Sequence, residues 1–180
     1  MRTVLGLGLA ALLSAAATAG PTASARMMDT TGHSAGEAHF RGGPHGVLLE
    51  LKVTGLPPGA HAVLLHLNGV CDPKTGFASA GPVLDFDLGR PHGYFAKGGP
   101  KPGDLPQQFA AADGTLHASF YSTAISLGEG KRSIFGRDGA SLIVHAAGDD
   151  YVSQPDGRAG ARLLCGAITR DAAPARRKKK

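Results

Sequence analysis

Aromatic side chains, cysteines and long apolar runs are all scarce in this chain of 180 residues. Aromatic residues make up 6% of it, tryptophan is absent, and there are two cysteines. The apolar run near the N-terminus ends at Leu13, so it is shorter than the ~20 residues that a membrane-spanning helix needs. Nucleic-acid-binding proteins present a basic folded surface with aromatic side chains, and neither is visible here. The sequence therefore argues against a membrane anchor and against nucleic acid as a partner.

Glycine and proline, in contrast, are abundant. With 27 Gly and 12 Pro the chain is too rich in turn residues for a helical bundle. Its hydrophobic content of 42% is too high for a disordered chain. The length fits one domain with terminal extensions. We expect a single all-β domain with many turns.

Short runs of alternating apolar and polar residues support this fold class. They cover residues 47–53, 61–67, 116–122 and 141–147, and turn residues separate them. This spacing is typical of a β-sandwich or barrel. Two long irregular regions, 68–108 and 146–161, interrupt the pattern. Loops of this length in a compact domain usually serve, or once served, a function.

The first 25 residues have the features of a secretory signal peptide. Arg2 precedes the apolar run, and small residues occupy the A-x-A positions that end at Ala19 and Ala25. No cysteine follows either cleavage position, which argues against a lipid anchor. We expect residues 1–25 to be removed after Ala19 or Ala25, and the protein to be periplasmic or secreted.

We expect residues 26–36 to form a flexible leader. The leader and the residues after it hold four soft or borderline metal ligands, namely Met27, Met28, His33 and His39. They could complete a metal site, but no tight spacing repeats among them. An ordinary disordered leader is the simpler interpretation.

The positive charge of the chain is concentrated at its C-terminus. Residues 170–180 hold six cations and one anion, which accounts for the formal net charge of +5. We expect this segment to be a disordered basic tail that makes weak contact with anionic envelope surfaces. The sequence does not reveal another partner or the oligomeric state.

Export has a consequence for Cys71 and Cys165. In an oxidising compartment a pair of cysteines is bridged rather than free. A bridge between these two would close a loop across most of the domain, which is worth ~4–5 kcal/mol in the chain-entropy estimate.

Several segments together resemble one known family. They are "GLPPGAHAVLLHLNGVC", "SAGPVLDF", "PGDLP", "ADGT", "LIVHAAGDDY" and "GRAGARLLCGAI". In this order and spacing they are similar to the bacterial secreted copper/zinc superoxide dismutases, from about Glu37 to Ile168. The resemblance implies an eight-stranded Greek-key β-barrel over residues 37–169, with two long loops and the disulfide. It also implies four copper histidines and a zinc site with one histidine shared between the metals.

Only two of the four implied copper positions hold a histidine in this sequence. His61 matches the family's structural histidine, Leu64 stands at the first copper position, and His66 keeps the next. Leu64 and His66 share one strand face by period-2 alternation, so the ligand is replaced and the register is not shifted. Val83 stands at the position of the bridging histidine. His145 matches the last copper ligand.

The zinc positions are also depleted. The resemblance assigns His92, offset by one residue, and Asp104 to zinc, whereas Lys101 stands at the remaining histidine position. It further assigns Asp149 to orienting metal-bound imidazoles and Arg162 to attracting superoxide. Each residue also has a structural interpretation: hydrogen-bonded barrel histidines, a turn cap for Asp104, and carbonyl contacts that brace a loop for Arg162.

Two functions fit these residues. The first is an exported family member that has lost dismutase chemistry and serves a binding role in the envelope. The second is an enzyme that disproportionates superoxide with copper alone, through His66, His145 and ligands outside the motif. Zinc is not expected as a cofactor, and copper is expected to bind weakly if it binds.

Overall fold

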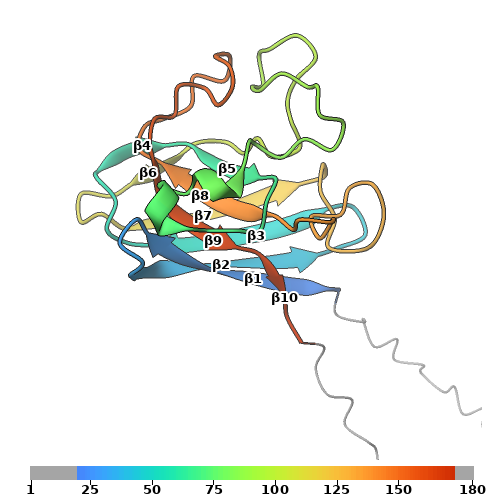
Figure 1. Cartoon of the computed structure of the whole chain (residues 1–180), viewed down its shortest axis with the longest axis horizontal. Helices are drawn as coiled ribbons and strands as arrows, with labels where there is room; N and C mark the ends of the chain where they lie inside the picture. Colours follow the sequence, from blue (N-terminus) through green and yellow to red (C-terminus); the bar gives the residue numbers. More distant parts are fainter. Residues whose placement is uncertain (1–19, 173–180) are drawn as a thin grey trace, which may run out of the picture.

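The computed structural model describes residues 20–172 (Figure 1). Its strands are β1 (Thr22–Asp29), β2 (Ser34–Gly42), β3 (Val47–Val53), β4 (Gly59–His61), β5 (Val63–His66), β6 (Gln108–Ala110), β7 (Leu116–Ser122), β8 (Ser141–His145), β9 (Arg162–Ala167) and β10 (Thr169–Arg170). Two 3-10 turns, η1 (Pro73–Thr75) and η2 (Ala78–Ala80), are the helical elements of this range. No helix within it has the length and apolar character that crossing a membrane requires.

The strands form a curled antiparallel sheet with the order β5-β8-β9-β1-β2-β3-β7, and β10 pairs with β1. The short strands β4 and β6 pair separately. The predicted all-β fold is thereby confirmed, and the sheet curls into a half-barrel. The predicted disulfide between Cys71 and Cys165 is also present, with the two Cα atoms 5.7 Å apart.

Alternation explains why these segments become strands. In β3 the side chains of Val47, Leu49, Leu51 and Val53 are buried, whereas Lys52 is exposed. Full burial of one such aliphatic side chain contributes roughly 1.5–3 kcal/mol. β3 pairs along its whole length with β2 and with β7, so its buried face lies in the main core of the barrel.

The prediction of a flexible leader at residues 26–36 is wrong. These residues belong to β1, to the turn that joins β1 to β2, and to the start of β2. Ala23, Ala25 and Met27 are buried against the core, and β1 pairs with β2, β9 and β10. Small alanines in an A-x-A pattern are typical of a processing site, and here they also fill the inward face of a strand. The predicted signal peptide otherwise lies outside the described residues.

The start of the predicted tail is also part of the fold. β10 ends at Arg170, whose guanidinium donates to the carbonyl oxygen of Leu127 at 2.6 Å and stacks on Phe135. The backbone N–H of Asp171 donates to Thr22. Residues 173–180 lie outside the described range. The ordered domain therefore begins before residue 37 and ends after residue 169.

The two long irregular regions are loops, as the sequence predicts. One joins β5 to β6 and the other joins β8 to β9, and both rise above the barrel at the end opposite to the chain termini (Figure 1). The predicted strand 61–67 is divided at Ala62, because β4 pairs with β6 whereas β5 pairs with β8.

Candidate functional site

The site is built on the outer faces of β5 and β8. Val63 and Leu65 of β5 point into the main core, so the alternating residues Leu64 and His66 point to the other side. Antiparallel pairing aligns β5 with β8, which contributes His145 on the same face as Ile143. The predicted parity of Leu64 and His66 therefore agrees with the strand geometry.

His66 and His145 meet in this site. Both are buried, and their Nε2 atoms lie 3.4 Å apart. His66 Nδ1 donates to the Gly81 carbonyl at 2.8 Å, and His145 Nδ1 donates to the Gly160 carbonyl at 3.2 Å. Burial lowers the pKa of His66 to about 3 and also lowers that of His145. Each ring is therefore neutral with its proton on Nδ1, and two unprotonated Nε2 atoms face each other.

The two replaced copper positions are apolar and closely packed. Leu64 and Val83 form one buried cluster with Ala62 and Ala159. Val83 also pairs with His66 through an isolated β-bridge. The structure thus brings Leu64, Val83, His66 and His145 into one region in which two neighbours of the imidazoles are hydrocarbon.

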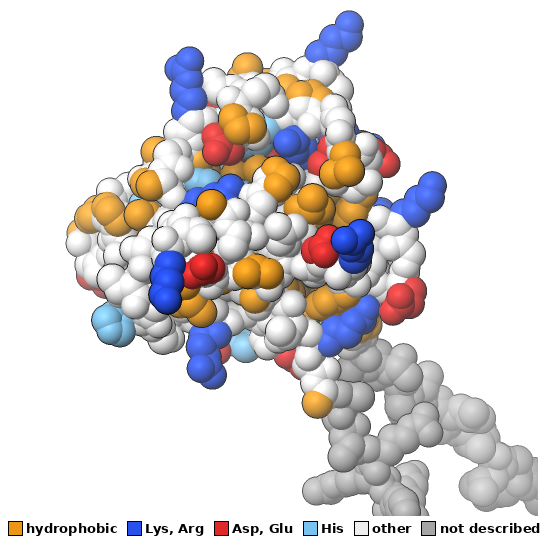
Figure 2. Space-filling view, viewed as in Figure 1, with side chains coloured by type: hydrophobic (Ala, Val, Ile, Leu, Met, Phe, Trp, Pro, Cys, Tyr) orange, Lys and Arg blue, Asp and Glu red, His pale blue; other side chains and the backbone are white. Residues whose placement is uncertain are grey.

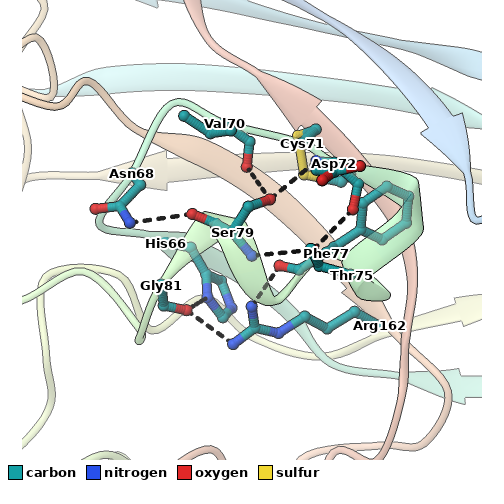
Figure 3. Close-up of a disulfide and its surroundings, with 11 residues drawn as sticks. His66, Asn68, Val70, Cys71, Asp72, Thr75, Phe77, Ser79, Gly81 and Arg162 are labelled. Atoms are coloured by element: carbon teal, nitrogen blue, oxygen red, sulfur yellow. Dashed lines mark hydrogen bonds between the residues drawn. A yellow bond between two sulfur atoms is a disulfide. The ribbon is translucent and has the colours of Figure 1, made fainter.

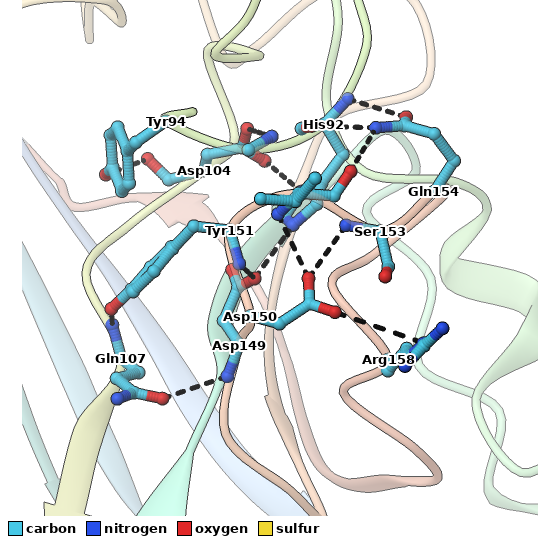
Figure 4. A network of polar contacts seen from close by, with 12 residues as sticks. His92, Tyr94, Asp104, Gln107, Asp149, Asp150, Tyr151, Ser153, Gln154 and Arg158 are labelled. Atoms are coloured by element: carbon cyan, nitrogen blue, oxygen red, sulfur yellow. Dashed lines mark hydrogen bonds and ion pairs between the residues drawn. The ribbon is translucent and has the colours of Figure 1, made fainter. Parts of the chain in front are cut away.

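His92 lies between two carboxylates at the predicted zinc position (Figure 4). Its Nδ1 is 2.7 Å from Asp104 Oδ1, and its Nε2 is 3.0 Å from Asp149 Oδ1. Burial opposes the charged form of His92, but the hydrogen bonds to the two carboxylates outweigh it and raise its pKa to about 9. His92 is therefore an imidazolium at neutral pH, and both ring nitrogens are engaged.

Asp104 has no free oxygen with which to bind a metal. Oδ1 takes the His92 contact, and Oδ2 accepts the backbone N–H groups of Gly93 and Lys101 at 2.8 and 2.9 Å. The turn-capping interpretation of Asp104 is thus present in the structure. These bonds hold the loop from β5 to β6 together around Asp104, and the His92–Asp149 contact ties it to the loop between β8 and β9.

Asp149 has one satisfied and one unsatisfied oxygen. Oδ1 accepts from the backbone N–H of Tyr151 at 2.7 Å as well as from His92, whereas Oδ2 is buried without a hydrogen-bond partner. Gly157 passes so close that a Cβ at this position would overlap Asp149 Oδ1. The sequence analysis missed Gly157 and also Tyr94, Gln107, Tyr151 and Gln154, which hydrogen-bond around this network. Tyr151 and Gly157 lie in segments that carry the family resemblance, whereas no motif marks Tyr94, Gln107 and Gln154, which come from distant parts of the chain.

Arg162 is fully engaged with the loop that carries the disulfide (Figure 3). Its two terminal nitrogens donate to the carbonyl oxygens of Phe77 and Gly81 at 2.6 and 2.8 Å. The Gly81 carbonyl also accepts from His66. Arg162 therefore braces the loop against β9, as the structural interpretation expects, and it links the loop to the histidine pair.

His61 stands apart from the pair. Its Nδ1 is 2.6 Å from the carbonyl oxygen of His145, and its Nε2 is 2.8 Å from that of Pro57. This ring bridges two strands and the turn before β4, which agrees with a structural histidine.

The four soft or borderline ligands in the leader and just after it do not join the site. Met27 is buried in the main core, Met28 packs beside the disulfide, and the exposed His33 and His39 pair with acidic neighbours. Among residues 20–172, no three histidine, cysteine or acidic side chains are grouped as a metal ion would require.

The residues present do not fit a zinc ion. His92 and Asp104 use their donor atoms on each other, and Lys101 brings a positive charge to the third position. A structural zinc site needs four ligands, whereas the Asp104–His92–Asp149 network holds a proton where the family implies a dication. At the predicted copper position two imidazole nitrogens converge, and Leu64 and Val83 stand where the resemblance implies two further histidines.

The curled antiparallel sheet, the disulfide-bound loop and the histidines beneath two long loops define a barrel of the superoxide dismutase class. The profile for the family described as copper/zinc superoxide dismutase (SODC) matches residues 34–168, and the chain belongs to this family.

Similar proteins include both enzymes and enzyme-like relatives. The chain is 42% identical over 139 residues to the copper/zinc superoxide dismutase of Caulobacter vibrioides, covering 76% of this chain and 79% of the relative. It is 34% identical over 125 residues to the superoxide dismutase-like protein YojM of Bacillus subtilis, covering 68% and 63%. A solved double mutant of a dismutase-like protein from Bacillus subtilis, with a tyrosine and a proline replaced by histidine, matches with a TM-score of 0.75 and 30% identity over 80% of this chain and 95% of that one.

Proposed function

We propose that this chain is an exported member of the copper/zinc superoxide dismutase family that has lost the dismutase reaction and serves as a stable binding barrel in the cell envelope. Family membership supplies the barrel, the disulfide and the remnant histidines. The function itself must come from the site rather than from the fold.

One observation carries this proposal. The side chains at two copper positions, Leu64 and Val83, are 0% and 4% exposed and pack with each other in an apolar cluster. The side chains of both residues are hydrocarbon and contain no atom that can bind copper. The cluster therefore leaves the two imidazoles without further ligands. Two neutral imidazoles alone make a weak site for Cu(II), which prefers a tetragonal set of nitrogen and oxygen ligands.

A second candidate function is superoxide disproportionation with copper alone. The facing Nε2 atoms of His66 and His145 favour it, because two unprotonated nitrogens 3.4 Å apart repel each other until a cation lies between them. Monovalent copper accepts so few ligands more readily than the divalent ion. Met27 cannot supply a further copper ligand for this candidate function, since its side chain is buried in the main core.

The location in the envelope is part of the proposal. The A-x-A positions and the disulfide support export. The described chain leaves the barrel at the end opposite to the two loops (Figure 1). A basic tail attached there can contact an anionic surface while the loops remain accessible.

Metal analysis of protein purified from the periplasm, combined with a superoxide assay, tests the two functions. We expect substoichiometric copper and zinc, and superoxide decay no faster than that caused by free copper at the same concentration. The matched control is the His66→Gln/His145→Gln variant, which should behave like the wild type. Stoichiometric copper and turnover that this variant abolishes would establish the second candidate instead.

A further inference from the structure

A pocket of about 390 Å³ opens in the loop between β5 and β6, beside the remnant copper site. Its volume falls in the ~300–1,000 Å³ range of small-molecule sites. The residues that shape it are Pro82, Val83, Leu88, Arg90, Pro91 and Lys101. Val83 and Lys101 stand at two of the lost ligand positions. The substitutions that remove the metal ligands thus also form the wall of this pocket.

Lys101 gives the pocket a positive charge, which acts on the carboxylate of Asp85 in the same wall. Its backbone N–H donates to Asp104 Oδ2 at 2.9 Å, which holds the residue at the pocket wall. Within residues 20–172, its ammonium group forms neither an ion pair nor a side-chain hydrogen bond. Figure 2 shows other Lys and Arg side chains projecting from the end of the molecule that the long loops form.

The other charged groups of the pocket have hydrogen-bond or ion-pair partners. The carboxylate of Asp85 accepts backbone N–H groups from Asp87, Gly89 and Arg90 at 3.2, 2.8 and 2.8 Å, so it shapes its own turn. The Arg90 guanidinium lies 3.4 Å from Asp87 Oδ2. Within residues 20–172, the Lys101 ammonium is therefore the charged group of this wall that has no direct partner and can donate to a ligand.

The rest of the wall is made of Gln154, whose amide group hydrogen-bonds to the backbone of His92, and of apolar side chains. Leu88 is 76% exposed, and prolines at positions 82 and 91 flank it. An exposed leucine in the same wall as an ammonium group without a direct hydrogen-bond partner matches a ligand with one negative head and a hydrocarbon body. The hydrocarbon body of such a ligand would cover Leu88, and its negative head would pair with the Lys101 ammonium.

We propose that this pocket binds a small monocarboxylate with an apolar body, with the carboxylate against the Lys101 ammonium and the body over Leu88 and Pro91. The proposal deepens the binding role proposed above and rests on it. It does not depend on the absence of dismutase activity.

The test is a titration of the mature, disulfide-bonded protein with sodium acetate, butyrate and hexanoate, followed by amide chemical shifts in NMR spectra. We expect saturable shifts at the pocket residues and an affinity that rises by up to about threefold per added methylene group. Lys101→Gln should weaken hexanoate binding by about tenfold. Leu88→Ser should abolish the dependence on chain length while acetate binding is retained.

Lys97→Gln is the matched control, because Lys97 is exposed on the same loop, does not line the pocket, and changes the net charge equally. It should leave hexanoate binding unchanged. The proposal is overturned if hexanoate causes no saturable shift, or if both lysine variants weaken binding equally. Displacement of hexanoate by inorganic phosphate at equal concentration would also overturn it, since it would show attraction of anions without recognition of the body. Superoxide turnover with intact hexanoate binding would refute the proposed loss of catalysis and leave the pocket standing.

Discussion

The Nε2 atoms of His66 and His145 face each other at 3.4 Å, and neither carries a proton. The family resemblance implies four imidazoles at this site, and Leu64 and Val83 stand at the other two implied positions. The nearby Oδ2 of Asp149 has no partner. Both features place polar atoms without a protein donor next to the apolar cluster of Leu64 and Val83.

Restoring the two missing imidazoles should restore copper binding. In the Leu64→His/Val83→His variant, the new rings join His66 and His145, and Asp149 can accept a ring N–H with its unsatisfied oxygen. Without metal we expect this variant to lose about 2–5 kcal/mol of stability, because a buried leucine is replaced. Isothermal titration with Cu(II) and thermal unfolding with and without copper measure both effects.

The Leu64→Asn/Val83→Asn variant is the control, since it is polar at the same positions and supplies no imidazole. It should be destabilised without recovery on adding copper. Tight Cu(II) binding by the wild-type protein would contradict the expectation.

Zinc should not bind stoichiometrically to the wild-type protein. The proton held by His92 between Asp104 and Asp149 must be displaced, and Lys101 repels the ion. Equilibrium dialysis with metal analysis is the measurement. Lys101→His combined with Val83→His should raise the zinc content, and one zinc per chain in the unmodified protein would show that the network opens readily.

Stability should fall on both sides of about pH 6.5. The pKa of His92 is raised to about 9 in the fold, so its contribution is complete below the unfolded pKa and is lost as the pH rises to about 9, by up to about 3 kcal/mol. The pKa of His66 is lowered to about 3, so its contribution is complete above the unfolded pKa and is lost as the pH falls to about 3. Urea unfolding at a series of pH values measures both limbs.

One variant tests whether His92 causes the alkaline loss of stability, and a second variant is its control. Asp149→Asn should move the alkaline loss to lower pH, because one of the two carboxylates that raise the His92 pKa loses its charge. His117→Gln changes an exposed histidine and should leave the profile unchanged. An alkaline limb that is identical in the Asp149→Asn variant would mean that His92 does not cause it.

Arg162→Lys should destabilise the protein by about 1–2 kcal/mol, because lysine cannot bridge the carbonyls of Phe77 and Gly81 with a planar fork. Urea unfolding under non-reducing conditions is the measurement. Arg158→Lys is the control, since this side chain is 83% exposed and its nearest carboxylate lies 4.0 Å away. Equal stability of all three proteins would refute the bracing role.

The mature N-terminus should follow Ala19 rather than Ala25. Cleavage after Ala25 would remove the first half of β1, including Ala23, which pairs with Phe40 and Arg170. The intact mass of protein recovered from the periplasm distinguishes the two positions. A chain that begins at Arg26 and is as stable as the longer form would show that this half of β1 is dispensable.

Much of this protein is determined locally by its sequence. The alternation in residues 47–53 and 116–122 predicts β3 and β7 at their observed bounds, because each strand has one buried and one exposed face. The parity of Leu64 and His66 likewise follows from strand geometry alone. The resemblance then implies which ligand positions are replaced, since those segments keep the order and spacing of the family.

Other features were decided only by the tertiary structure. The alternation in β1 uses alanine and methionine, so it resembles a processing site until β2 and β9 are seen to pair with it. The contacts of His92 with Asp104 and Asp149 span 12 and 57 residues of sequence, and the contact of His145 with His66 spans 79. No local pattern encodes which side chain meets which across such separations. The pairing of a proton with two buried carboxylates arises because the loops fold back over the strands and exclude water there.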